Sequence, residues 1–188
     1  MKYLKTIRLK DGRECVLRNC TAEDAKAVLR LFLATLGQTD FLTAYPDEIH
    51  TTLEQEADYL HKQDESPDEV MILAEVDGIL AGSAAVHRIR SREKTRHRCG
   101  FGINVDRTWW GLGIGRGLTE ACIECAKSIG YLQMELEVVS ENQRAIALYE
   151  SVGFVEYGRN PKALRSRLGG WQENVLMRLE LEREEHGN

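Results

Sequence analysis

Apolar residues recur at helical intervals in several separate segments of the chain. Spacings of three and four residues run over residues 25–36 and 114–129, and this spacing is typical of a helix that buries one face. Thr21 begins a capping signal before the first segment. Gly37 follows the first segment and Gly130 follows the second, and each is typical of a helix end. The pattern therefore predicts two amphipathic helices. Shorter or weaker patterns predict two more helices, within residues 46–63 and 142–152.

Short apolar runs between these segments predict strands. Val70 to Val76 and Ile79 to His87 are such runs, and the Asp77-Gly78 pair between them favours a tight hairpin. We therefore expect two adjacent antiparallel strands here. Arg98 to Val105 also has strand character, and its two internal glycines indicate a bulge or the close approach of another molecule. Further strands are predicted near residues 13–18, 132–139, 154 and 175–181.

The composition is that of one globular α/β domain. Of the 188 residues 43% are hydrophobic and 29% are charged, which suffices for a single core. We expect one domain over residues 1–188. The net charge of -5 gives no support to nucleic-acid binding. The chain shows neither a signal peptide nor an apolar run of the ~18 residues that a membrane span needs, so we expect a cytoplasmic protein without a membrane partner.

The five cysteines predict core residues and reduced thiols. Their number is odd and they are scattered, which does not favour a disulfide framework. Cys122 and Cys125 have the spacing of a metal or redox pair, but both lie on the apolar face of a predicted helix, with no second Cys or His pair nearby. We therefore expect no metal.

The segment Val105 to Leu118 carries the strongest chemical signal. A strand end runs into glycines at positions 111, 113 and 115 and then directly into a helix. N–H groups at a helix start have no intrahelical partner, and glycine lets a phosphate approach them closely. The segment predicts a site for a diphosphate, although the glycines could also serve only a tight turn. A Rossmann fingerprint fails because Arg116 or Leu118 stands where its last glycine should be.

Two motifs resemble those of the GNAT N-acetyltransferases. Trp110-Gly111-Leu112-Gly113-Ile114-Gly115 resembles the family's acyl-CoA pyrophosphate loop, Gln/Arg-x-x-Gly-x-Gly/Ala, with Trp110 in place of Gln or Arg. Asn142 to Phe154 resembles the block Asn-x-x-Ala-x-x-Leu-Tyr-x-x-x-Gly-Phe. The motifs come in the family's order, with one predicted helix and one predicted strand between them. A weaker resemblance extends from about Cys15 to Leu181.

The resemblance implies a fold and an activity. The fold would be a mixed α/β sheet of about six to seven strands with helices on both faces. Its parallel strands over residues 98–105 and 132–139 would splay apart around the cofactor. The acetyltransferase domain would span about residues 15–182, before a short charged tail at 183–188. The implied activity is direct transfer of acetyl from acetyl-CoA to a primary amine of a small molecule, peptide or protein in a ternary complex. A non-catalytic acyl-CoA binding or sensing module is the alternative, and a homodimer would be common for the family.

The resemblance also implies roles for individual residues. Tyr149 would protonate the departing thiolate, although it could instead only pack on the core. The general base would be a carboxylate or histidine, which makes Glu137 and His97 the main candidates, with Glu135 and His87 beside them. An N–H of Ile103 or Val105 would bind the oxyanion. The residues expected to bind acetyl-CoA or coenzyme A are Ile103, Asn104, Val105, Gly111, Leu112, Gly113, Ile114, Gly115, Arg116, Asn142 and Tyr149.

Overall fold

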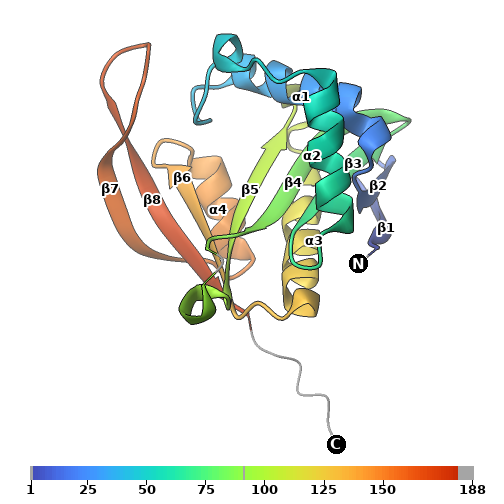
Figure 1. Ribbon diagram of the computed structural model, residues 1–188. Helices are drawn as coiled ribbons and strands as arrows, with labels where there is room; N and C mark the ends of the chain where they lie inside the picture. Colours follow the sequence, from blue (N-terminus) through green and yellow to red (C-terminus); the bar gives the residue numbers. More distant parts are fainter. Residues whose placement is uncertain (1, 91, 182–188) are drawn as a thin grey trace, which may run out of the picture.

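The computed structural model describes residues 2–90 and 92–181, so the predicted tail at 183–188 lies outside the described residues. One sheet of eight strands has the order β1-β2-β3-β4-β5-β6-β8-β7 (Figure 1). The strands are β1 (Leu4–Arg8), β2 (Glu14–Asn19), β3 (Val70–Val76), β4 (Ile79–Arg88), β5 (Arg98–Val105), β6 (Gln133–Val139), β7 (Val155–Arg165) and β8 (Trp171–Glu180). The α-helices of the described part are α1 (Ala25–Gln38), α2 (Leu53–Glu65), α3 (Ile114–Ile129) and α4 (Gln143–Ser151).

The helices cover both faces of the sheet, as predicted. On one face, Leu31 of α1 and Leu60 of α2 form a core cluster with Leu73 of β3. On the other face, Leu118 of α3 packs in the larger core cluster with Val86 of β4. Successive side chains of a strand point to opposite faces, so the central strands supply both clusters. Because both faces of these strands are buried, their sequences are continuous apolar runs.

Several local predictions are confirmed by the backbone. Asp77 and Gly78 both adopt positive φ, 51° and 76°, which is the twist that a two-residue hairpin between β3 and β4 requires. Gly130 ends α3 in the left-handed conformation with φ 98°. The helix predicted within residues 142–152 forms α4, and Asn142 directly before it is the N-cap, because its Oδ1 accepts a hydrogen bond from the N–H of Ala145 at 3.3 Å.

The sheet has eight strands where we expected about six or seven. The additional strand is β1, which pairs only with β2 at one edge of the sheet. Most of its side chains are exposed, so it shows no apolar run. β7 and β8 are also longer than predicted, because they continue as a largely exposed two-stranded hairpin.

The parallel pair at the centre of the sheet is open over most of its length. β5 and β6 are paired from Arg98↔Gln133 to Gly100↔Glu135, and no further. β5 nevertheless continues to Val105 along β4. The predicted splayed pair is therefore present, and it leaves one edge of the second half of β5 free.

The cysteines belong to the interior. All five are buried free thiols. Cys122 and Cys125 lie in the core cluster under α3, and burial raises the pKa of both thiols.

Among the described residues, no group of His, Cys, Asp and Glu is arranged to hold a metal ion. No helix of that part of the chain is long and apolar enough to cross a membrane.

Candidate active site

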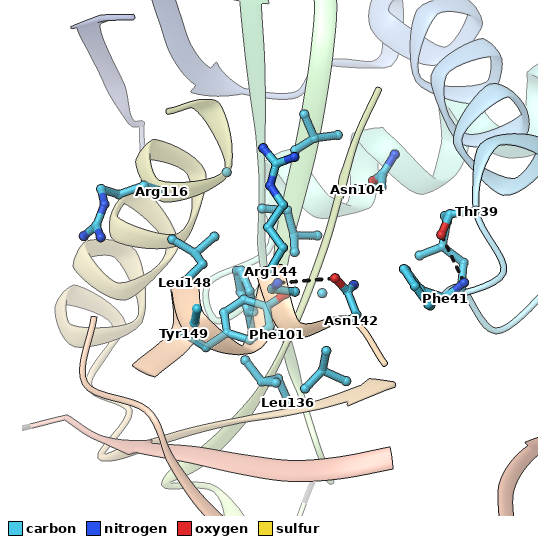
Figure 2. Close-up of a pocket in the computed structure, with 18 of the residues that line it drawn as sticks. Thr39, Phe41, Phe101, Asn104, Arg116, Leu136, Asn142, Arg144, Leu148 and Tyr149 are labelled. Atoms are coloured by element: carbon cyan, nitrogen blue, oxygen red, sulfur yellow. Dashed lines mark hydrogen bonds between the residues drawn. The ribbon is translucent and has the colours of Figure 1, made fainter. Parts of the chain in front are cut away.

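A cleft of about 1260 Å³ opens where β5 and β6 separate. Its walls come from β5, the glycine segment before α3, β6, α4 and the segment after α1. In Figure 2, Tyr149 and Phe101 lie at one side of this cleft, while Thr39 and Phe41 lie at the other. Both predicted motifs therefore contribute to one cavity, although about thirty residues separate them in the sequence.

The glycine segment has the geometry of an anion site. Gly111 and Gly113 adopt φ of 85° and 106°, a region that disfavours residues with a Cβ. Gly113 is the N-cap of α3, and the N–H of Gly117 donates the first helical hydrogen bond to its carbonyl at 3.0 Å. The N–H groups before that bond have no intrahelical acceptor, and they are those of Ile114, Gly115 and Arg116.

The main chain of β5 faces the cleft at alternate residues. The N–H of Asp106 donates to a β4 carbonyl at 3.0 Å, so the polar groups of Ile103 and Val105 point the other way, into the opening toward β6. The carbonyl of Val105 is already used, because it accepts a hydrogen bond from Trp110 Nε1 at 2.8 Å. The N–H groups of Ile103 and Val105 are thus directed into the cleft.

The side chain of Asn104 is committed to the fold. Its Oδ1 accepts a hydrogen bond from Ser83 Oγ at 2.7 Å, and its Nδ2 donates to Thr35 Oγ1 at 3.4 Å. Ser83 and Thr35 are buried, so this network joins β4, β5 and α1. Asn104 therefore lines the cleft with both of its side-chain polar groups already hydrogen-bonded within the protein.

Tyr149 is buried at the inner side of the cleft. Its ring meets Phe101 edge-on, with centroids 6.1 Å apart, and lies 5.9 Å from the ring of Phe154. Burial raises the pKa of the Tyr149 hydroxyl above its usual range. The hydroxyl therefore stays protonated at neutral pH, which is the form that can donate a proton or a hydrogen bond.

Two carboxylates of β6 reach the cleft, and their surroundings differ. Glu135 binds Arg98 through both of its oxygens, one of them at 2.7 Å, and also accepts from Gln133 at 2.7 Å. The Arg98 guanidinium holds the pKa of Glu135 below its usual range. Glu137 is exposed and accepts a hydrogen bond from Asn174 Nδ2 at 3.0 Å. Of the two, Glu137 carries no cationic partner among the described residues.

The two histidines considered for the base, His97 and His87, lie in different places. His97 is exposed in the segment before β5, where its carbonyl accepts a hydrogen bond from the N–H of Leu132 at 2.9 Å. This is the paired end of β5 and β6, outside the cleft lining. His87 of β4 does line the cleft, and its ring lies so close over Gly100 that a Cβ there would overlap it. Gly100 therefore makes room for His87.

Two basic side chains of the lining were not selected from the sequence. Arg144 extends from α4, and Lys10 comes from the turn between β1 and β2. Arg144 lies inside the second motif, two residues after Asn142. Its closeness to Asn142 in the sequence could therefore have indicated that it lines the cleft. No sequence pattern connects Lys10 to the cleft, because the turn between β1 and β2 meets the glycine segment only in the folded chain, where the N–H of Lys10 donates to the carbonyl of Leu112.

These features together define a class of fold. An opened parallel strand pair, a glycine-turned helix start beside it and a buried tyrosine on the next helix form the scaffold of acyl-CoA N-acyltransferases. The family model for the acetyltransferase (GNAT) family matches residues 33–154, and the chain belongs to this family.

Relatives and solved structures agree with this assignment. The chain is 29% identical over 112 residues to an L-amino acid N-acyltransferase of Escherichia coli, a match that covers 60% of this chain and 64% of that relative. A GNAT acetyltransferase structure from Streptococcus pneumoniae superposes with a TM-score of 0.84 at 28% identity, covering 88% and 99% of the two chains. An acetyltransferase structure from Salmonella typhimurium with its cofactor acetyl-CoA has a TM-score of 0.80 at 20% identity, covering 93% and 98%.

Proposed function

We propose that the protein is an acetyl-CoA-dependent N-acetyltransferase. It would transfer the acetyl group directly, in a ternary complex, to a primary amine of an amino-acid-like molecule, a peptide or a protein. One observation carries the proposal: the unpaired N–H groups at the start of α3, the free edge of β5 and the Tyr149 ring all line the same cleft. Family membership supports the same activity.

The cleft carries main-chain groups that suit two parts of acetyl-CoA, the diphosphate and the pantetheine arm. The N–H groups of Ile114, Gly115 and Arg116 suit the diphosphate. The cleft-facing main chain of Ile103 and Val105 suits the amides of the pantetheine arm. Acetyl-CoA would supply an activated thioester between these residues and Tyr149.

The residues around the reacting centre have complementary roles. The neutral Tyr149 hydroxyl would donate a proton or a hydrogen bond to the leaving sulfur. Glu137 would accept a proton from the acceptor amine, because Glu135 is occupied by Arg98 whereas Glu137 is not. An N–H of Ile103 or Val105 would stabilise the oxyanion. His97 is a weaker candidate for the base, because it lies outside the cleft lining.

The acceptor would lie against the segment that follows α1, where Phe41, Leu42 and Thr43 line the cleft. The similarity to an L-amino acid N-acyltransferase makes amino acids the first acceptors to test. Peptides with a free N-terminus are the second class. The cytoplasmic location and the homodimer stay predictions.

The first test is calorimetric titration of the purified protein with acetyl-CoA, coenzyme A and NAD. We expect micromolar binding of the first two and none of NAD. Release of free thiol from acetyl-CoA is then measured with a panel of L-amino acids and short peptides. Absence of acetyl-CoA binding would refute the proposal, whereas binding without thiol release for any amine would favour the non-catalytic sensing module.

A further inference from the structure

The indole of Trp110 forms a fixed platform beside the glycine segment. Its Nε1 donates a hydrogen bond to the carbonyl of Val105 at 2.8 Å, which ties the ring to the end of β5. Two guanidinium groups lie near the ring centroid, that of Arg144 at 5.3 Å and that of Arg107 at 5.6 Å. A cation within ~6 Å of an indole centroid is attracted to the ring. Trp110 therefore restricts the positions that both arginines adopt.

Only one of these two arginines belongs to the cleft lining. Arg144 lines the cleft and Arg107 does not. In Figure 2 the Arg144 side chain extends from α4 away from Tyr149. Its guanidinium lies over Gly111, with Nη2 3.7 Å from the place that a Cβ on this glycine would take. The cation therefore stands next to the loop that leads into the start of α3.

The charge of Arg144 is available to a ligand. Within the described residues, no carboxylate lies within ion-pair distance of its guanidinium. Arg116, the other arginine of the lining, donates instead to Ser151 Oγ at 2.7 Å and lies 3.4 Å from Glu120. The loop below Arg144 is held in place, because the carbonyl of Leu112 accepts a hydrogen bond from the N–H of Lys10 at 3.0 Å.

We propose that Trp110 holds Arg144 over the glycine segment as a phosphate-binding residue for the acyl-CoA. The inference rests on the proposed function, because the phosphates are those of coenzyme A. A guanidinium presents two parallel N–H donors to phosphate oxygens. Stacking on a fixed ring removes part of the side-chain freedom before the ligand arrives, so less conformational entropy is lost on binding.

The test is calorimetric titration of four proteins with coenzyme A and with 3′-dephospho-coenzyme A. The proteins are the wild type, Arg144→Gln, Trp110→Leu and Arg107→Gln. We expect Arg144→Gln to weaken coenzyme A binding about tenfold, the size of one lost charge-assisted hydrogen bond. Trp110→Leu should weaken it about threefold, as the loss of one exposed cation–π contact implies. Arg107→Gln is the matched control and should bind as the wild type does, because Arg107 contacts the same ring outside the cleft.

The second ligand distinguishes which phosphate Arg144 contacts. An equal loss with both ligands would assign Arg144 to the diphosphate, and a loss confined to coenzyme A would assign it to the 3′-phosphate; either result supports the inference. Wild-type affinity of Arg144→Gln for both ligands would overturn it, while the proposed function would stand. A wild type that binds neither ligand would refute the proposed function itself.

Discussion

At the scale of single residues, Tyr149 combines burial with access to the cleft. Tyr149→Phe removes only the hydroxyl and keeps the ring packing on Phe101 and Phe154. We expect kcat to fall about 100-fold, the usual size of a lost general acid, with stability changed by less than about 1 kcal/mol. Steady-state kinetics and thermal unfolding measure both. Wild-type kcat in the phenylalanine variant would leave Tyr149 as a packing residue.

The pH profile gives a second measurement on the same hydroxyl. Burial raises the pKa of Tyr149, so the protonated, donating form persists as the pH rises past the usual range for tyrosine, about 10. Between about pH 8 and pH 10, the kcat of the wild type should therefore change with pH in the same way as the kcat of Tyr149→Phe, without an additional decrease. Such a loss would mean that the hydroxyl ionises more easily than its burial allows.

Glu135 and Glu137 provide a matched pair for the assignment of the base. We expect Glu137→Gln to lower kcat about 100-fold without changing the affinity for acetyl-CoA. Glu135→Gln should act mainly on stability, because it removes the partner of Arg98. The lowered pKa of Glu135 means that this stabilisation is present at neutral pH and is lost as the pH falls through that pKa. A larger loss of kcat in Glu135→Gln than in Glu137→Gln would contradict the assignment.

At the scale of elements, the start of α3 depends on the backbone of Gly113. Gly113 and Gly169 share left-handed φ values, 106° and 110°, and a Cβ at either would meet no other atom. Alanine at each should therefore cost roughly 1–2 kcal/mol through backbone strain alone. Gly113→Ala should also weaken acetyl-CoA binding, because relief of the strain turns the N–H groups of α3 away. Gly169→Ala, in the turn between β7 and β8, is the control: equal losses of affinity in both variants would count against the anion site.

At the scale of the whole molecule, Asp40 joins two segments that are far apart in the sequence. Its carboxylate accepts hydrogen bonds from Tyr45 at 3.0 Å and from Ser166 at 2.5 Å, and its carbonyl accepts one from Gln172 at 2.9 Å. The tip of the β7–β8 hairpin is thereby attached to the segment after α1. Phe41, which follows Asp40 directly, lines the cleft.

This junction should govern the acceptor side of the cleft alone. We expect Asp40→Ala to raise the KM of the acceptor about fivefold, because the segment loses its attachment, and to leave acetyl-CoA affinity unchanged. Asp47→Ala is the control, since Asp47 meets Arg167 in an exposed ion pair of small energetic weight. A loss of acetyl-CoA affinity in Asp40→Ala would show that the hairpin supports the whole cleft rather than its acceptor side.

The sequence by itself determined the parts of the protein that depend on local chemistry. The glycines before α3 and the Asp77-Gly78 turn could be predicted because positive φ is a property of single residues. The helices and central strands followed from the period of their apolar positions. The predicted phosphate loop and Tyr149 could be selected from the sequence because each lies within a continuous motif.

Only the tertiary structure decided the features made by residues that are distant along the chain. The ion pair with Arg98 distinguishes Glu135 from Glu137, although the two glutamates are two residues apart and lie on the same face of β6. His97, which the family resemblance made a candidate for the base, lies at the closed end of the strand pair. No local pattern in the sequence predicts the positions of Lys10 and Asp40 or the stacking of Arg144 on Trp110. A pattern within one segment reports which face is buried, whereas a contact between segments depends on how the whole chain packs.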